Sequence, residues 1–174
     1  MTLFQFEEKV PTIGEGTYVA LSAEVIGGVT IGDKCYIGSG AKIRGDYTTI
    51  HIGNQTSVQE NCVIHARYGE TCTIGDNVTI GHGAIIHGSI IKNNIIIGMG
   101  AIISDGAIIN DHVIIGAGAV VRERQTLEEG SLAVGVPCKV IREVSESQKM
   151  FITSSAEMYC ELAQRYLQGL KKIK

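Results

Sequence analysis

A six-residue period of aliphatic residues constrains the fold of this 174-residue chain more than any other feature. Isoleucine or valine recurs at every sixth residue, with three short breaks in the series, and glycine often follows. The eighteen positions are Ile13, Val19, Val25, Ile31, Ile37, Ile43, Ile52, Val58, Ile64, Ile74, Ile80, Ile86, Ile91, Ile97, Ile103, Ile109, Ile115 and Val121. An α-helix would need a period of 3.6 residues. Six residues instead fit one short strand and one turn, with the aliphatic side chain inward and a residue without Cβ at the corner.

Three such units form one triangular coil of 18 residues. Coils of this kind stack as parallel strands about 4.8 Å apart, and each coil buries its face only against its neighbours. The chain has 26 Ile and 14 Val against 7 Leu, and β-branched residues favour strands. The sequence therefore predicts an all-β solenoid, a parallel β-helix of hexapeptide repeats, as a domain over residues 1–143. We expect the repeat to end near Val121 and a loop to follow it.

The segment 144–174 has a helical pattern instead. Ser145 and Gln148 have the spacing of a capping box at a helix start. Apolar residues then recur at alternating intervals of four and three, which is typical of one helix face. They are Ile152, Ala156, Tyr159, Ala163, Tyr166 and Leu170. We predict a C-terminal α-helix that packs along the prism.

Composition excludes several functions. The net charge of −3 argues against a nucleic-acid binder that works by bulk charge. No apolar run approaches the roughly 18 residues of a membrane-spanning helix, and the start does not resemble a secretory signal. The cysteines are odd in number and lack CxxC spacing: Cys35, Cys62, Cys72, Cys138 and Cys160. We therefore predict free thiols, a cytoplasmic location, and neither nucleic acid nor membrane as a partner.

Three histidines have an informative phase on the six-residue grid. His65 and His87 each directly follow a grid residue, and their separation of 22 equals one 18-residue coil plus a four-residue insertion. They should stack one strand spacing apart, where two imidazoles can share one metal ion. His82 lies two residues after a grid position, on another face, so it cannot easily join the other two within one prism, and a second copy of the chain could supply it. Three histidine nitrogens and an open fourth position are typical of catalytic zinc, which lowers the pKa of bound water to about 7.

Other polar residues lie near this edge. Gln59 and Glu60 follow a grid residue in the coil that ends in His65, where they could orient a water or hydroxide. Arg44 and Asp46 precede the first insertion, and we interpret them as an ion pair that holds a loop or a subunit interface.

These motifs together resemble the gamma-class carbonic anhydrase family. They are Arg44-Gly45-Asp46, Gln59-Glu60-Asn61 followed by His65, then Gly81-His82 and His87-Gly88. The resemblance implies a left-handed β-helix and a homotrimer. It implies zinc, or iron or cobalt, bound by His65 and His87 of one chain and His82 of its neighbour. The implied reaction is the reversible hydration of carbon dioxide to bicarbonate by a metal-bound hydroxide at a subunit interface.

The resemblance also assigns roles to single residues. Gln59 matches the residue that hydrogen-bonds the hydroxide, Glu60 stands where the family usually has Asp, and Tyr159 matches a tyrosine near the site. These three are the implied catalytic residues, and Arg44 with Asp46 matches the interface pair. The sequence departs from the best-known active members in three places. Ser57 replaces an Asn, Tyr47 replaces a Glu, and the insertion 66–70 is short and lacks the acidic loop that carries the proton shuttle.

Two other functions are compatible with the repeat. Hexapeptide prisms also serve acyl-CoA-dependent acyl- or acetyltransferases, which use a histidine as general base and need no metal. A third possibility is a non-catalytic family member that keeps the metal as a structural staple. The cluster of three histidines favours the carbonic anhydrase.

Overall fold

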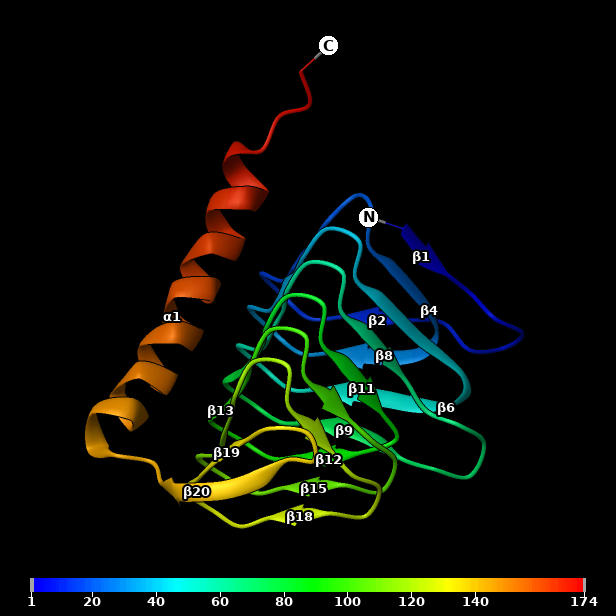
Figure 1. The fold of residues 1–174 in the computed structure, drawn as a ribbon. Coiled ribbons are helices and arrows are strands. Elements are labelled where there is room, and N and C mark those ends of the chain that lie inside the picture. The colour runs from blue at the N-terminus through cyan, green and yellow to red at the C-terminus, as the bar shows by residue number, and fades with distance from the viewer. Residues whose placement is uncertain (1, 174) are drawn as a thin grey trace.

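The computed structural model describes residues 2–173 and shows a three-faced prism of short parallel strands with one long helix along its side (Figure 1). The predicted fold class is confirmed: the chain is a left-handed parallel β-helix of hexapeptide repeats with a C-terminal α-helix. Successive coils run parallel and in register, so each strand hydrogen-bonds to the strands one coil before and after it.

Each face of the prism is a ladder of strands. The helix-covered face holds β3 (Tyr18–Val19), β5 (Tyr36–Ile37), β7 (Ser57–Val58), β10 (Val78–Ile80), β13 (Ile95–Ile97), β16 (Ile114–Ile115) and β19 (Ser131–Val134). The histidine face holds β1 (Thr2–Phe4), the first parts of β4 (Glu24–Ile31) and β6 (Lys42–Ile52), then β8 (Val63–His65), β11 (Ile85–His87), β14 (Ile102–Ile103) and β17 (Val120–Val121). The third face holds β2 (Thr12–Ile13), the last parts of β4 and β6, then β9 (Cys72–Ile74), β12 (Ile90–Ile91), β15 (Ile108–Ile109) and β18 (Thr126–Leu127).

The six-residue grid forms the core. Every grid residue from Val19 to Val121 is buried, and the grid residues stack upon one another from coil to coil. Burying one such side chain contributes about 1.5–3 kcal/mol, so the regular column of aliphatic residues is the main source of stability.

The prism extends beyond the end that the sequence suggested. Leu127 and Ala133 continue the six-residue series after Val121, and both are buried in strands β18 and β19. The expected loop is therefore partly another stretch of coil. The signal was weak there because leucine and alanine are not β-branched. After it, β20 (Lys139–Glu143) turns back and pairs antiparallel with β19.

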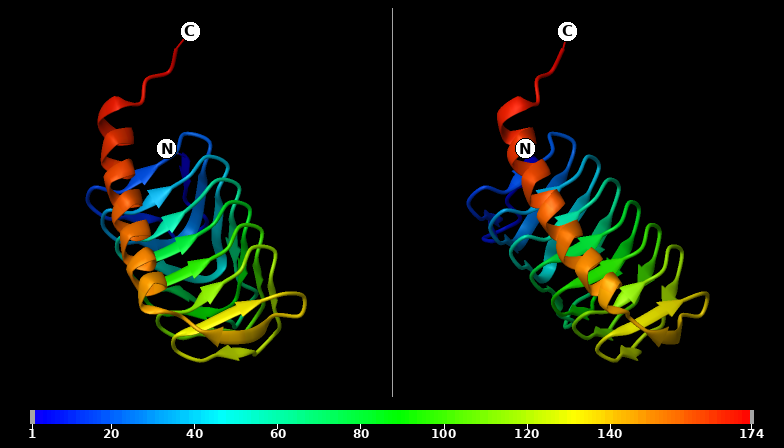
Figure 2. Two further views of the ribbon diagram at one scale, coloured as in Figure 1. Left: turned by 60° about the vertical axis from the view of Figure 1, so that its left-hand side comes forward. Right: turned by 90° about the vertical axis from the view of Figure 1, so that its left-hand side faces the viewer.

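The predicted helix is confirmed as α1 (Glu146–Gly169), which lies across the strands of one face (Figure 2). Ser145 is its N-cap, and both hydrogen bonds of the capping box with Gln148 are present. The apolar stripe packs on β3, β5, β7 and β10. Ile152 is buried as expected. Leu170 is exposed, because it is the C-cap and has extended backbone angles.

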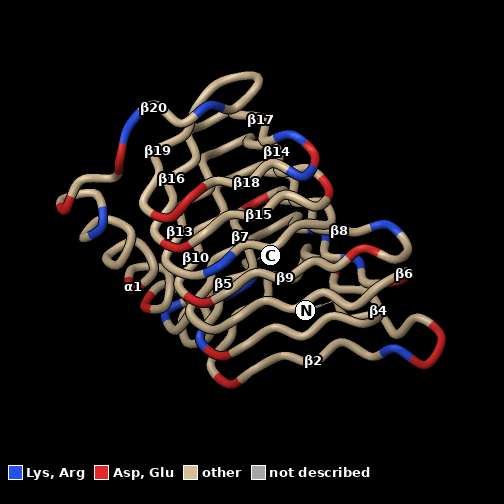
Figure 3. The backbone as a smooth tube through the Cα atoms, turned by 90° about the horizontal axis from the view of Figure 1, so that it is seen from below, with Lys and Arg blue, Asp and Glu red and all other residues tan. Residues whose placement is uncertain are grey.

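The polar surface lies at the corners. Figure 3 shows acidic and basic residues mainly at turns and in loops, around strands that carry few charges.

All five cysteines are free thiols, as predicted. Within residues 2–173 there is no helix of the length and hydrophobicity needed to cross a membrane.

Candidate functional site

The register of the prism brings His65 and His87 together, as the spacing predicted. They are the last residues of β8 and β11 and are paired directly across these strands. Their ring centroids lie 5.2 Å apart, and His65 Nδ1 lies 3.2 Å from His87 Nε2.

A carboxylate contacts the other nitrogen of each ring. His65 Nε2 lies 3.1 Å from Asp46 Oδ1, and His87 Nδ1 lies 2.6 Å from Asp105 Oδ1. An ionised carboxylate only accepts hydrogen bonds, so in the neutral rings these two nitrogens carry the protons. The two nitrogens that face each other then both present lone pairs, which repel at this distance unless a cation lies between them. Two nitrogen ligands of a tetrahedral zinc lie about 3.3 Å apart, so the pair fits such an ion.

The surroundings favour this protonation. Burial alone would raise the pKa of Asp46, but hydrogen bonds from the Arg44 guanidinium and the Tyr47 backbone N–H outweigh it and hold the pKa below its usual value. Burial lowers the pKa of His65, which keeps the ring neutral and able to bind a metal.

Asp105 and Arg67 are functional candidates that sequence reasoning missed. The Arg67 guanidinium lies 3.0 Å from the second carboxylate oxygen of Asp105 and so holds the partner of His87. Asp105 follows His87 by one coil of 18 residues, and this spacing could have identified it.

His82 lies at a different corner, two residues after β10. Its half-exposed side chain contacts Glu60, with Nδ1 2.7 Å from Oε2, which leaves Nε2 as the free nitrogen. Glu60, rather than Gln59, is thus the direct neighbour of His82 one coil away. Within one chain, the described residues contain no group of three or more His, Cys, Asp or Glu side chains placed to hold a metal ion.

The remaining predicted residues lie around these corners. Gln59 is buried in the turn after β7, and its backbone N–H donates to Ile80 O at 3.0 Å. Tyr159 lies on α1, with its ring 5.5 Å from that of Tyr36. The catalytic roles of Gln59, Glu60 and Tyr159 stay predictions.

Two departures from the family pattern can also be located. The exposed Tyr47 ring has its centroid 6.2 Å from that of His65, in an edge-on arrangement. Ser57 is fully buried on the helix-covered face, and its hydroxyl has no hydrogen-bond partner among residues 2–173.

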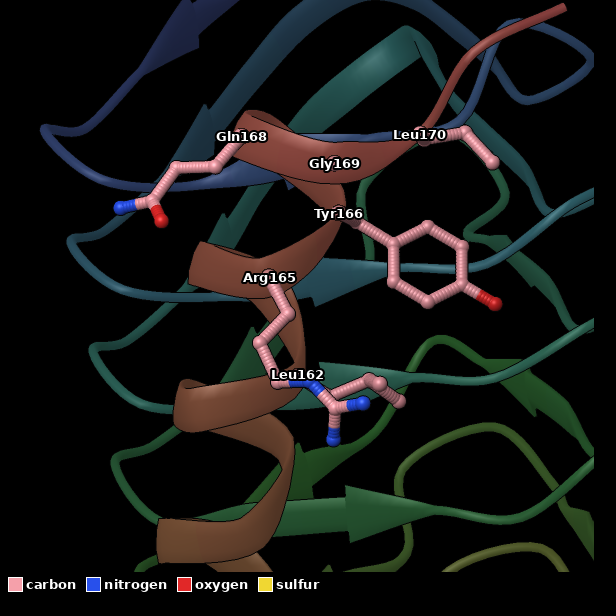
Figure 4. A pocket seen from close by; sticks show the side chains of 6 residues that line it. All are labelled: Leu162, Arg165, Tyr166, Gln168, Gly169 and Leu170. Atoms are coloured by element: carbon pink, nitrogen blue, oxygen red, sulfur yellow. The ribbon is translucent and has the colours of Figure 1, made fainter.

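A groove lies at the end of α1, away from the histidines. It has a volume of about 490 Å³, and Figure 4 shows its lining residues. They are Leu162, Arg165, Tyr166, Gln168, Gly169 and Leu170. None of these is a predicted site residue, and the groove holds no acid–base pair or cluster of metal ligands. A centre shared between chains is open surface in one chain, so it need not form a cavity there.

Curated relatives named as carbonic anhydrases match this chain over most of its length, and a carnitine operon protein also matches it. Over 152 residues the chain is 43% identical to a protein named "Probable carbonic anhydrase" of Methanocaldococcus jannaschii, covering 87% of this chain and 96% of that protein. Over 171 residues it is 36% identical to "Gamma carbonic anhydrase 1, mitochondrial" of Arabidopsis thaliana, covering 95% of this chain and 62% of that protein. Over 174 residues it is 34% identical to "Carnitine operon protein CaiE" of Salmonella typhi, covering 100% of this chain and 88% of that protein. No protein-family model matches.

Solved structures agree on the fold. A Bacillus cereus protein described as a "putative acetyltransferase" superposes with a TM-score of 0.93 at 34% identity, covering 95% of this chain and 96% of that one. A "hexapeptide transferase family protein" of Anaplasma phagocytophilum gives 0.90 at 32% identity, covering 95% and 98%.

The lengths and locations of these relatives differ. The chain spans only about three fifths of the length of the two Arabidopsis relatives, 62% and 61%. Both of these are named as mitochondrial, so the cytoplasmic location stays a prediction. The Methanocaldococcus relative is matched over nearly its whole length. The motifs, the prism and these identities together show that the chain belongs to the gamma-class carbonic anhydrase family.

Proposed function

We propose that this protein catalyses the reversible hydration of carbon dioxide to bicarbonate at a metal centre shared between the chains of a homotrimer. The observation that carries the proposal is the pair of facing imidazole nitrogens of His65 and His87, 3.2 Å apart, each ring held by its own carboxylate. Such carboxylate–histidine pairs are the usual outer support of metal-binding imidazoles.

His65 and His87 of one chain and His82 of the next would hold zinc, or iron or cobalt, through three neutral nitrogens. Such an ion supplies a Lewis acid that makes a bound water acidic near neutral pH. The amide of Gln59 would orient the attacking water, and Asp46, Glu60 and Asp105 would fix the imidazole rings. The proton released in the reaction leaves to solvent.

An apolar patch beside the histidines supports a homotrimer. Val63 and Ile85 precede His65 and His87 by two residues on β8 and β11, so they point outward on the same face. Each is 39% exposed, an arrangement that fits a contact between chains. A neighbouring prism on this face would also bring the free nitrogen of a His82 toward the pair.

Mixing two inactive variants tests the shared centre. His82→Ala and His87→Ala chains should each bind little zinc alone. In a trimer that contains both, one of the three interfaces regains His65 and His87 from one chain and His82 from the other. Random co-assembly should therefore restore about a quarter of the wild-type zinc content and hydration activity. No recovery in verified mixed trimers would contradict the shared centre.

Acyl transfer is the second candidate, favoured by the two transferase names among the structural relatives. A transferase base needs one histidine and no metal, which does not account for the facing lone pairs. Acetyl-CoA turnover by metal-free protein, without hydration activity of the metal-loaded protein, would support it. Stoichiometric zinc without either activity would support a metal-stapled, non-catalytic role.

A further inference from the structure

Glu60 connects the candidate centre to the buried face beneath α1. Its Oε2 contacts His82 Nδ1 at 2.7 Å, while its Oε1 accepts a hydrogen bond from the Tyr36 hydroxyl at 2.8 Å. Both carboxylate oxygens are thus engaged, which fixes the plane of the carboxylate. The corner residue Gly38 leaves room for it, because a Cβ there would come within 2.9 Å of Oε1.

Tyr36 itself has little freedom to move. It is only 3% exposed, and its ring centroid lies 5.6 Å from that of Tyr18 and 5.5 Å from that of Tyr159 on α1. Burial, and then the hydrogen bond to Glu60, raise the pKa of Tyr36 far above its usual value. The hydroxyl therefore keeps its proton and acts as a donor.

We infer that Tyr36 is a positioning residue: its hydroxyl holds the Glu60 carboxylate, which in turn keeps His82 in the Nδ1–H form with Nε2 directed outward as the third metal ligand. This inference rests on the proposed function, because only a metal ligand role for His82 gives these hydrogen bonds between Tyr36, Glu60 and His82 a function. It adds that the packing of Tyr36 beneath α1 fixes the orientation of His82, which serves as a metal ligand at the site of the neighbouring chain.

Removal of the hydroxyl alone is the sharpest test. Tyr36→Phe keeps the ring and its packing but leaves Glu60 with one partner. Losses of outer supports typically weaken metal binding about 10- to 100-fold, and we expect about 10-fold here because Glu60 still accepts from His82. Tyr18→Phe is the matched control. This variant removes the Tyr18 hydroxyl, which has no hydrogen-bond partner among residues 2–173, from the same aromatic cluster. The Tyr18→Phe protein should bind zinc like the wild type.

Two measurements separate positioning from general loss of structure. The zinc dissociation constant is measured by competition with a chromophoric chelator. The tautomer of His82 is read from ¹⁵N-histidine NMR of the metal-free protein, where wild type and Tyr18→Phe should show Nδ1–H and Tyr36→Phe a mixture. Because Tyr36 acts only through Glu60, the double variant Tyr36→Phe/Glu60→Gln should bind zinc no more weakly than Glu60→Gln alone.

The outcomes distinguish this inference from the proposed function. If the wild type binds zinc, and Tyr36→Phe either binds it equally well or shows the wild-type His82 tautomer in its metal-free form, the inference is overturned and the proposed function stands. Wild type that takes up no zinc overturns both.

Discussion

Under the proposed function, the amide of Gln59, at the corner next to Glu60, would hold the reacting water without adding charge near the metal, because it is an uncharged donor and acceptor. Gln59→Ala should lower carbon dioxide hydration about 10- to 100-fold while zinc content changes little. Stopped-flow hydration and metal analysis of the same sample measure both quantities. Gln168→Ala, on the exposed side of α1, is the control. Full activity in Gln59→Ala would make Gln59 a turn residue only.

The buried cysteines allow a prediction that depends on pH. Burial raises the pKa of Cys35, Cys62 and Cys72 to about 11 each. At pH 8 only about one in a thousand of these thiols is ionised, against about a quarter for a thiol of ordinary pKa. We expect native alkylation more than 100-fold slower than in denaturant, with a rate that rises as the pH approaches 11. Peptide mass spectrometry identifies each site, and rapid labelling of these three at pH 8 would contradict the prediction.

At the scale of elements, the start of α1 depends on its cap. Ser145→Ala removes the side-chain acceptor for the Gln148 backbone N–H and should lower the free energy of unfolding by about 1 kcal/mol. Ser154→Ala, within the helix, is the comparison. It should not lower the free energy of unfolding in the same way, because alanine is a better helix former than serine. Urea denaturation followed by circular dichroism measures both variants. Equal unfolding midpoints for Ser145→Ala and wild type would show that the cap contributes nothing.

The strands show how far the sequence can be interpreted without a structure. The six-residue period predicts the prism and the stacking of His65 on His87, because register follows directly from residue counting. It gives no sign of Arg67 or Tyr36, whose contacts depend on side-chain direction and on where α1 lies. The coil length of 18 residues does relate His87 to Asp105, so that partner was open to prediction.

At the scale of the whole molecule, the apolar patch should decide assembly. Ile85→Glu places a charge on the histidine face and should give monomers that lose tightly bound zinc, while the prism stays folded. Ile90→Glu is a close control, since Ile90 is 38% exposed on the third face and Ile85 is 39% exposed. Light scattering after size-exclusion chromatography measures the mass. Trimeric Ile85→Glu that keeps its zinc would exclude this face as the interface.

We expect His82 to contribute to metal binding and not to the stability of the fold. His82→Ala removes a half-exposed side chain and leaves the aliphatic column untouched, so its melting temperature should stay within a few degrees of that of metal-free wild type. Zinc content should fall to near zero. Thermal denaturation and metal analysis test the two halves of this statement.

The repeat itself does not limit the number of coils, because every coil has the same shape. The unpaired parallel edges at the ends of two prisms could therefore pair and form a filament. The reversed strand β20 opposes this on the helix-covered face of the C-terminal end. It pairs antiparallel with β19, with a shift in register between Leu132 and Ala133, and it is exposed along its whole length. An incoming coil would meet a strand of the wrong direction bearing Lys139 and Arg142 instead of a parallel edge. On this face the end of the prism therefore offers no parallel edge to a second prism, which favours association through the sides over end-to-end growth.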